Sequence, residues 1–140
     1  MGTVPPIAGM QNSELDAACI YDARCGIGVY SPLFNPMTYE PHKAYYAFTA
    51  FNELRKLGSA VKVSQSPTPG LWSAAARRGD RAALMLVNSS AKPVAVNCET
   101  PGFAVETCRL TDDTRTEAET ALPPELPPHA ICVVLLKAAK

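Results

Sequence analysis

The acidic side chains are the first candidates for chemistry, because two carboxyl groups facing one cleft can divide the work of proton donor and nucleophile. Such a pair needs its carboxyls roughly 5–9.5 Å apart. Asp16 and Asp22, which Glu14 precedes, lie six positions apart on one expected strand, and ~3.3 Å per residue then separates them by about 20 Å. Asp112 and Asp113 are adjacent in a polar, turn-like run, where we expect solvated carboxylates. No carboxylate pair with catalytic spacing remains.

Cysteine and histidine could hold a metal ion or supply a nucleophile. The candidates are Cys19, Cys25, Cys98, Cys108, Cys132, His42 and His129. They include no Cys-x-x-Cys pair, so the close local spacing of a zinc site is missing and we expect no metal or other cofactor. The odd number of cysteines, with three of them in apolar runs, favours reduced and buried thiols. A bridge between Cys98 and Cys108 stays open, and we expect His129 to be structural.

Three further motifs have a functional and a structural interpretation. Trp72 is the only tryptophan; an exposed one could stack on a sugar, but a core or interface position is the commoner role. Gly26-Ile-Gly28 lacks the third glycine and the strand–turn–helix context of a phosphate loop. Asn88-Ser-Ser has the form of an N-glycosylation sequon, which matters only in a eukaryotic secretory context.

The composition limits the class of protein. The chain has 140 residues, 47% hydrophobic and 19% charged, which is typical of one globular domain or one domain with an appendage. Its 13 basic and 13 acidic residues balance, so we expect neither a nucleic-acid nor a membrane-surface partner. No apolar run approaches the ~20 residues of a membrane span and no signal peptide is visible. We therefore expect a soluble protein, with unpaired cysteines favouring the cytoplasm.

The clearest expected element is a helix over about 41–57. Pro41 suits the first helical position because its φ is preset and it needs no donor there. An apolar stripe follows at helical spacing, formed by Ala44, Ala47, Phe48, Phe51 and Leu54. Gly58 then supplies the left-handed stop. A buried strand at about 16–22 and a long loop over 24–40 precede this helix.

After Gly58 the apolar period changes to two. Strands are expected over 60–65, 71–78, 81–88, 93–98, 103–110 and 130–136, with Gly79-Asp80 as a hairpin turn. The proline-rich stretch 111–129 is expected to cross an edge of the sheet, because proline cannot donate to a ladder. The fold class is therefore mainly β: an antiparallel, Greek-key-like β-sandwich preceded by one strand–loop–helix unit.

The N-terminal segment resembles a known family. The run from Gln11 to Arg24 resembles the eighth barrel strand of (β/α)8 glycoside hydrolases of the xylosidase and arabinofuranosidase type. Gly28-Val-Tyr-Ser-Pro is similar to the loop before their last helix, and 41–58 is similar to that helix. Leu126-Pro-Pro-His is similar to the entry of the last sandwich strand. The resemblance covers about 11–136, is strongest over 16–58, and departs from the family at Cys25-Gly-Ile.

The resemblance implies two parts: residues 1–58 as a remnant of the barrel and 59–140 as the C-terminal β-sandwich. It implies a bacterial hydrolase of carbohydrate metabolism as the parent. Such enzymes carry their catalytic carboxylates on the fourth and seventh barrel strands, and no position here matches either motif. The resemblance therefore predicts no catalytic residue in this chain, no activity of the chain alone, and a structural role supporting the barrel.

Sugar contacts are the remaining functional hypothesis. The resemblance places Tyr21, Asp22 and Arg24 at the C-terminal end of a barrel strand, where such barrels keep their chemistry. There they could line a sugar subsite, or Asp22 and Arg24 could simply pair with each other. A carbohydrate-binding module is the first alternative, and it requires Trp72 and neighbouring tyrosines exposed in one row.

The second alternative is an interaction domain. The resemblance leaves the helix at 41–57 and the strand at 16–22 without the barrel that would cover them. We therefore expect an exposed apolar patch and self-association through that patch or through an open strand edge. If instead the helix folds onto the sandwich, it covers its own apolar stripe.

Overall fold

The computed structural model describes residues 14, 32–58, 60–61 and 68–139 of the chain. The expected strand at 16–22 and the first part of the expected loop, 24–31, lie outside these residues. So do Cys19 and Cys25.

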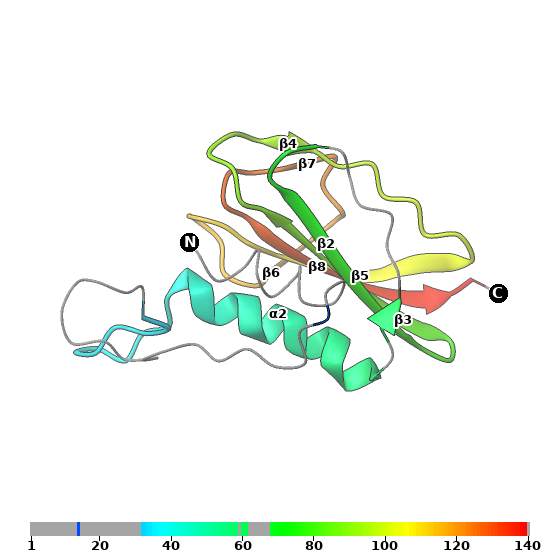
Figure 1. Cartoon of the computed structure of the whole chain (residues 1–140), viewed down its shortest axis with the longest axis horizontal. Coiled ribbons are helices and arrows are strands. Elements are labelled where there is room, and N and C mark those ends of the chain that lie inside the picture. The colour runs from blue at the N-terminus through cyan, green and yellow to red at the C-terminus, as the bar shows by residue number, and fades with distance from the viewer. Residues whose placement is uncertain (1–13, 15–31, 59, 62–67, 140) are drawn as a thin grey trace.

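The described chain is mainly β, as the sequence predicts. Its elements are α2 (Lys43–Leu57), β1 (Ala60–Val61), β2 (Leu71–Arg78), β3 (Arg81–Asn88), β4 (Val94–Ala95), β5 (Phe103–Thr111), β6 (Ala118–Thr120), β7 (Glu125–Leu126) and β8 (Ile131–Ala138). Six strands form one sheet in the order β1-β2-β3-β8-β5-β6, and β4 pairs with β7 in a second, small sheet. All pairings are antiparallel. Figure 1 shows α2 along one side of the large sheet and β4 and β7 on the other.

Each face of the large sheet has its own core, because each face has its own cover. Alternate residues of β3 point to opposite faces. Met85 and Val87 pack with the α2 side chains, whereas Leu84 and Leu86 pack on the side of β7. This explains why β3 is buried at nearly every position. A strand with one wet face would instead alternate between buried and exposed residues.

The helix begins two residues later than predicted. Pro41 forms an isolated bridge with Phe34 instead of the first helical turn, and His42 is the extended residue that precedes the helix. The His42 backbone N–H is bound to the Leu33 carbonyl at 2.8 Å. The preceding turn therefore holds both residues outside the helix. Gly58 ends the helix as predicted, with a left-handed φ of 79° and its N–H bound to the Leu54 carbonyl.

The buried stripe of α2 is shifted from the predicted one. Ala47, Ala50 and Leu54 are its buried residues, and Phe51 packs at its margin. Phe48 is 37% exposed. Small alanines let the helix lie close to the sheet, and this leaves the larger Phe48 ring at the edge of the contact.

Strands β2 and β3 have the predicted bounds, and Gly79 supplies the positive φ of their two-residue turn. Strand structure is described for only two residues in each of the predicted segments 60–65 and 93–98. The sequence predicts that 111–129 crosses an edge of the sheet, and it identifies no separate strand there. This stretch forms β6 at the sheet edge and the two-residue β7. The prolines flank β7, so Glu125 and Leu126 keep the N–H groups that pairing requires.

Candidate functional site

The strongest cluster of charged side chains among the described residues lies between α2 and the β5–β6 end of the sheet. Arg109 of β5 places its guanidinium 3.1 Å from the Glu53 carboxylate of α2 and 4.0 Å from that of Glu117. The Thr49 hydroxyl of α2 donates to Glu117 at 3.0 Å. We call Thr49, Glu53, Arg109 and Glu117 the helix–sheet seam. It joins α2 to the β5–β6 region, which lies at least 56 positions further along the chain.

The seam keeps the Glu53 carboxylate ionised. Partial burial would raise the pKa of Glu53, but hydrogen bonds from Lys56 and Arg109 outweigh it and lower that pKa below 4.5. Lys56 lies 3.1 Å from Glu53 on the same helix. A glycosidase acid needs the opposite, a carboxyl whose pKa is raised so that it still carries its proton near neutrality. The seam is therefore built for pairing, not for proton donation.

The hollow beside the seam is too small for a sugar. It is lined by Tyr46, Ala50, Arg109, Thr111, Glu117, Ile131 and Val133. The free space accommodates roughly one water molecule. A sugar ring with a carboxyl group on each side needs a far larger cleft. This hollow, which described residues line, therefore cannot serve as a substrate site.

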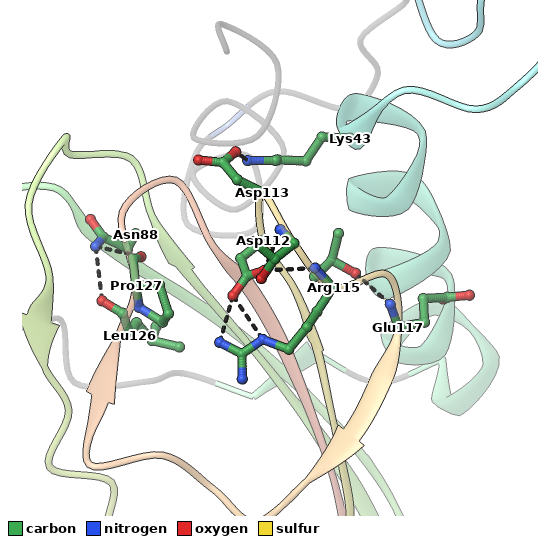
Figure 2. A network of polar contacts seen from close by, with 10 residues as sticks. Lys43, Asn88, Asp112, Asp113, Arg115, Glu117, Leu126 and Pro127 are labelled. Atoms are coloured by element: carbon green, nitrogen blue, oxygen red, sulfur yellow. Dashed lines mark hydrogen bonds and ion pairs between the residues drawn. The ribbon is translucent and has the colours of Figure 1, made fainter.

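A second polar group lies at the turn between β5 and β6 (Figure 2). Asp112 accepts hydrogen bonds from the Arg115 guanidinium and from the backbone and hydroxyl of Thr114. Burial would raise the pKa of Asp112, but these bonds outweigh it and hold the pKa well below its ordinary value. Asp113 is exposed and pairs with Lys43 at the start of α2. Asp112 therefore stabilises the turn through its hydrogen bonds. The sequence instead predicts a solvated carboxylate at this position.

Asn88 connects three segments of chain from a fully buried position. Its Nδ2 amide donates to the carbonyls of Lys92, Leu126 and Pro127 at 2.7, 3.2 and 2.9 Å. Its Oδ1 accepts from the backbone N–H and the hydroxyl of Ser90. Figure 2 shows the amide facing the chain at Leu126 and Pro127. The apparent sequon is therefore a structural element, since Asn88 is 0% exposed and its amide nitrogen is fully engaged.

Trp72 lies at the start of β2 and is 39% exposed. Its indole N–H donates to the Ser89 hydroxyl at 3.1 Å, and that hydroxyl in turn donates to the Gly70 carbonyl. Tyr39 and Tyr45 are also exposed, but they belong to α2 and the segment before it. These positions do not form a platform on one strand.

The other predicted site residues, Tyr21, Asp22 and Arg24, lie outside the described residues. No group of three His, Cys, Asp or Glu side chains that could hold a metal ion occurs in the part of the chain that the structure describes. Within the same part, none of the helices has the length and hydropathy to cross a membrane. His129 has a positive φ of 54°, and its buried Nδ1 atom has no hydrogen-bond partner among the described residues.

A mainly β domain with one helix packed on its sheet is the class that these observations define. The chain is similar in fold to part of the glycoside hydrolase family 30 subfamily 8 xylanase Xyn30A from Clostridium acetobutylicum, with a TM-score of 0.61 and 19% identity over 76% of this chain and 31% of that one. It is also similar to a GH30 endoxylanase from Clostridium papyrosolvens C71, with a TM-score of 0.56 and 17% identity over 76% of this chain and 30% of that one.

The chain thus spans less than a third of the length of these two structures. At these identities the likeness shows the fold alone. No protein-family model matches the sequence, and no curated protein matches it either.

The sequence did not point to the seam, because its members lie up to 68 positions apart. Glu53 lies outside the apolar stripe that the sequence predicts for the helix. A weak signal did exist: Arg109 lies between Cys108 and Leu110 in a predicted strand, where a partly buried charge needs a partner of opposite sign. The sequence alone does not say which carboxylate that partner is.

Proposed function

We propose that this chain supplies the C-terminal β-sandwich, residues 59–140, and the last barrel helix of a glycoside hydrolase, and that its own role is structural. In this proposal residues 1–58 belong to the barrel, and the parent enzyme is of the xylosidase or arabinofuranosidase type. The similarity of fold to parts of two xylanases supports the parent class. The three described cysteines are free, which supports a reducing compartment such as the cytoplasm.

The observation that carries this proposal is the way the sheet holds α2. Ala47, Ala50 and Leu54 bury the helix against β2, β3 and β8. The seam then fixes one margin through Arg109 and Glu53, both largely covered side chains. A sandwich that packs against a helix and also forms ion pairs with it can stabilise the domain to which that helix belongs.

Hydrogen exchange tests the bracing role. In Arg109→Ala the carboxylates of Glu53 and Glu117 lose their shared partner, so the α2 amides should exchange faster while the central β3 and β8 amides stay protected. Arg81→Ala is the matched control, because Arg81 pairs with Glu106 at an exposed end of the sheet. Equal exchange of α2 in both variants would contradict the proposal.

A turnover assay tests the absence of catalysis. We expect the chain to release no product from aryl xylosides or aryl arabinofuranosides. Glu53→Gln and Glu117→Gln serve as controls, because these are the carboxylates that the seam brings together. Turnover that disappears in either variant would show that the seam is catalytic and would overturn the structural role.

The half-exposed Trp72 favours one second candidate, a carbohydrate-binding module. In that case Tyr21, Asp22 and Arg24 would add sugar contacts. Trp72 is the only tryptophan, so intrinsic fluorescence reports its surroundings without ambiguity. On titration with xylo-oligosaccharides we expect no saturable change, because β2 has no second aromatic side chain beside Trp72 to complete a stacking platform. A saturable change that is absent in Trp72→Phe would favour the binding module instead.

A further inference from the structure

The two buried thiols between the sheet and its β4–β7 cover have no role in the proposed function. Cys108 of β5 and Cys132 of β8 lie on adjacent, antiparallel strands. Their Sγ atoms are 3.1 Å apart, and the side chains are 2% and 0% exposed. Cys98 packs at the edge of the same core. Apolar packing alone does not require two thiols at this separation, since either could be replaced by another small apolar residue.

The register of the two strands explains the approach of the thiols. Cys108 is opposite Val134, and Cys132 is opposite Leu110, so the two cysteines are diagonal neighbours. Both side chains point to the face of the sheet that β7 covers, where Leu110 and Leu126 surround them. Diagonal neighbours on one face of an antiparallel pair are within side-chain reach. A movement of roughly 1 Å would bring the two sulfur atoms to the 2.03–2.05 Å of a disulfide bond.

We propose that Cys108 and Cys132 form an oxidisable dithiol, which hydrogen peroxide or a similar small peroxide converts into a disulfide bond between β5 and β8. Cys108 attacks one peroxide oxygen, the O–O bond breaks, and Cys108 becomes a sulfenic acid as one water leaves. The Cys132 sulfur then attacks the Cys108 sulfur, the S–O bond breaks, and a second water leaves. Two thiols and one peroxide therefore give one disulfide and two waters, with the two electrons accepted by the peroxide.

The division of roles follows from the hydrogen bond between the thiols. A hydrogen bond from Cys132 lowers the pKa of Cys108, against the effect of burial. The same bond and burial raise the pKa of Cys132. Burial raises the pKa of Cys98. Since the thiolate is the nucleophile, we assign the first step to Cys108 and the second to Cys132; the same disulfide bond forms from the pair in either order.

Access comes through the small sheet. Strands β4 and β7 are two residues long each and pair only with one another. Local opening of such a short pair costs less than unfolding of the six-stranded sheet, so a peroxide can reach the thiols while β5 and β8 stay paired. The bridge then closes within a single chain.

Peptide mapping tests the proposal. The full chain is treated with hydrogen peroxide, its remaining thiols are alkylated in denaturant, and the monomer is isolated without reduction. A protease that cleaves after glutamate cuts at Glu99 and Glu106, and so separates Cys98 from Cys108. The expected product links the peptide 107–117 to the peptide 126–140, and it disappears on reduction. Trypsin would be uninformative, because it leaves Cys98 and Cys108 in one peptide.

Variants make the result specific. Cys98→Ser should form the same linked peptide at an unchanged rate, whereas Cys108→Ala and Cys132→Ala should form none. If either alanine variant fails to fold, the linked peptide from the unchanged chain still shows whether Cys108 and Cys132 form the disulfide bond. A link that contains Cys98 would overturn the proposal. So would sulfinic acid on Cys108 without a link, or two thiols that stay reduced while β4 and β7 amides exchange freely.

Discussion

The two faces of the large sheet are covered in different ways. Among the described buried residues, alanine is common on the face toward α2: Ala47, Ala50, Ala74, Ala76 and Ala83. On the face toward β7 the buried residues are larger, with Leu84, Leu86, Leu110, Leu126 and Leu136 among them. On the helix side, the small side chains let α2 lie close to the sheet. On the β7 side, the larger side chains fill a wider space beneath chain that is mostly irregular.

The polar contacts on the two faces also differ in their exposure to water. On the helix side the seam pairs charges at a margin that water still reaches. On the β7 side Asn88 binds carbonyl groups from a position with no exposure. Removing a partner from a partly hydrated ion pair costs little, whereas leaving buried backbone groups unpaired costs much. The stability of the β7 side should therefore depend mainly on Asn88, whereas the packing of the helix should depend on several residues.

The largest expected effect comes from Asn88→Asp. The change keeps the shape of the side chain but removes the amide donor, and it places a carboxylate against the carbonyls of Lys92, Leu126 and Pro127. We expect a loss of about 3 kcal/mol or more in the free energy of unfolding, measured by urea denaturation. Asn52→Asp on α2 is the control for the same chemical change, and it should cost under about 0.5 kcal/mol. Similar losses in both variants would show that Asn88 has no special role.

The next effect comes from enlarging the close contact on the helix side. Ala47 is 0% exposed, so Ala47→Leu forces α2 away from the sheet and should cost about 1–3 kcal/mol. Arg55→Leu tests leucine on the exposed side of the same helix and should leave the thermal midpoint nearly unchanged. If Ala47→Leu were neutral, the helix would not be held as closely as described.

A smaller effect follows from the seam. Arg109→Met should lower the free energy of unfolding by about 1–2 kcal/mol, because it leaves Glu53 without its cross-element partner. Arg81→Met breaks a pair whose side chains are 57% and 41% exposed, so we expect at most about 0.5 kcal/mol. Equal midpoints in thermal denaturation would remove the distinction between the seam and an ordinary surface pair.

The pH dependence of stability reports on Glu53 and Asp112. The folded pKa values of Glu53 and Asp112 lie below the ordinary 4.5 and 3.8. The unfolded state therefore binds more protons in this range, and stability falls as the pH falls. The contribution is present in full above the ordinary pKa values and is lost as the pH drops through the lower folded ones. Asp112→Asn should flatten this fall in denaturation curves between about pH 5 and pH 2; an unchanged slope would contradict the assignment.

The sequence predicted the regular elements better than the connections between them. Strands β2 and β3 are set by local alternation and by Gly79, and the end of α2 is set by Gly58. The start of α2 was misplaced because Pro41 pairs with Phe34, a contact that local propensity does not reveal. Strand β7 was missed for a similar reason. Its two residues gain a partner only when the distant β4 lies beside them.

The candidate site was less predictable than the fold. Sequence reasoning favoured residues of suggestive type, and three of these, Tyr21, Asp22 and Arg24, lie outside the described residues. The seam and the thiol pair instead depend on contacts across 56 and 24 positions, between Glu53 and Arg109 and between Cys108 and Cys132. Neither distance leaves a periodic signal in the chain. The buried role of Asn88 was also not predicted, because the form of its motif is typical of exposed loops, whereas Asn88 here ends a buried strand.

Asn88 also has a practical consequence for producing the protein. Oligosaccharide transfer to an asparagine replaces a hydrogen of its amide nitrogen with a bulky sugar, and it acts on chains that are still being secreted. Here that nitrogen has no room for a sugar and uses its hydrogens to join β3 to the chain around β7. Expression through a eukaryotic secretory pathway would therefore yield glycosylated chains that cannot close this side of the sheet. Expression in a host without this modification would leave folding unhindered.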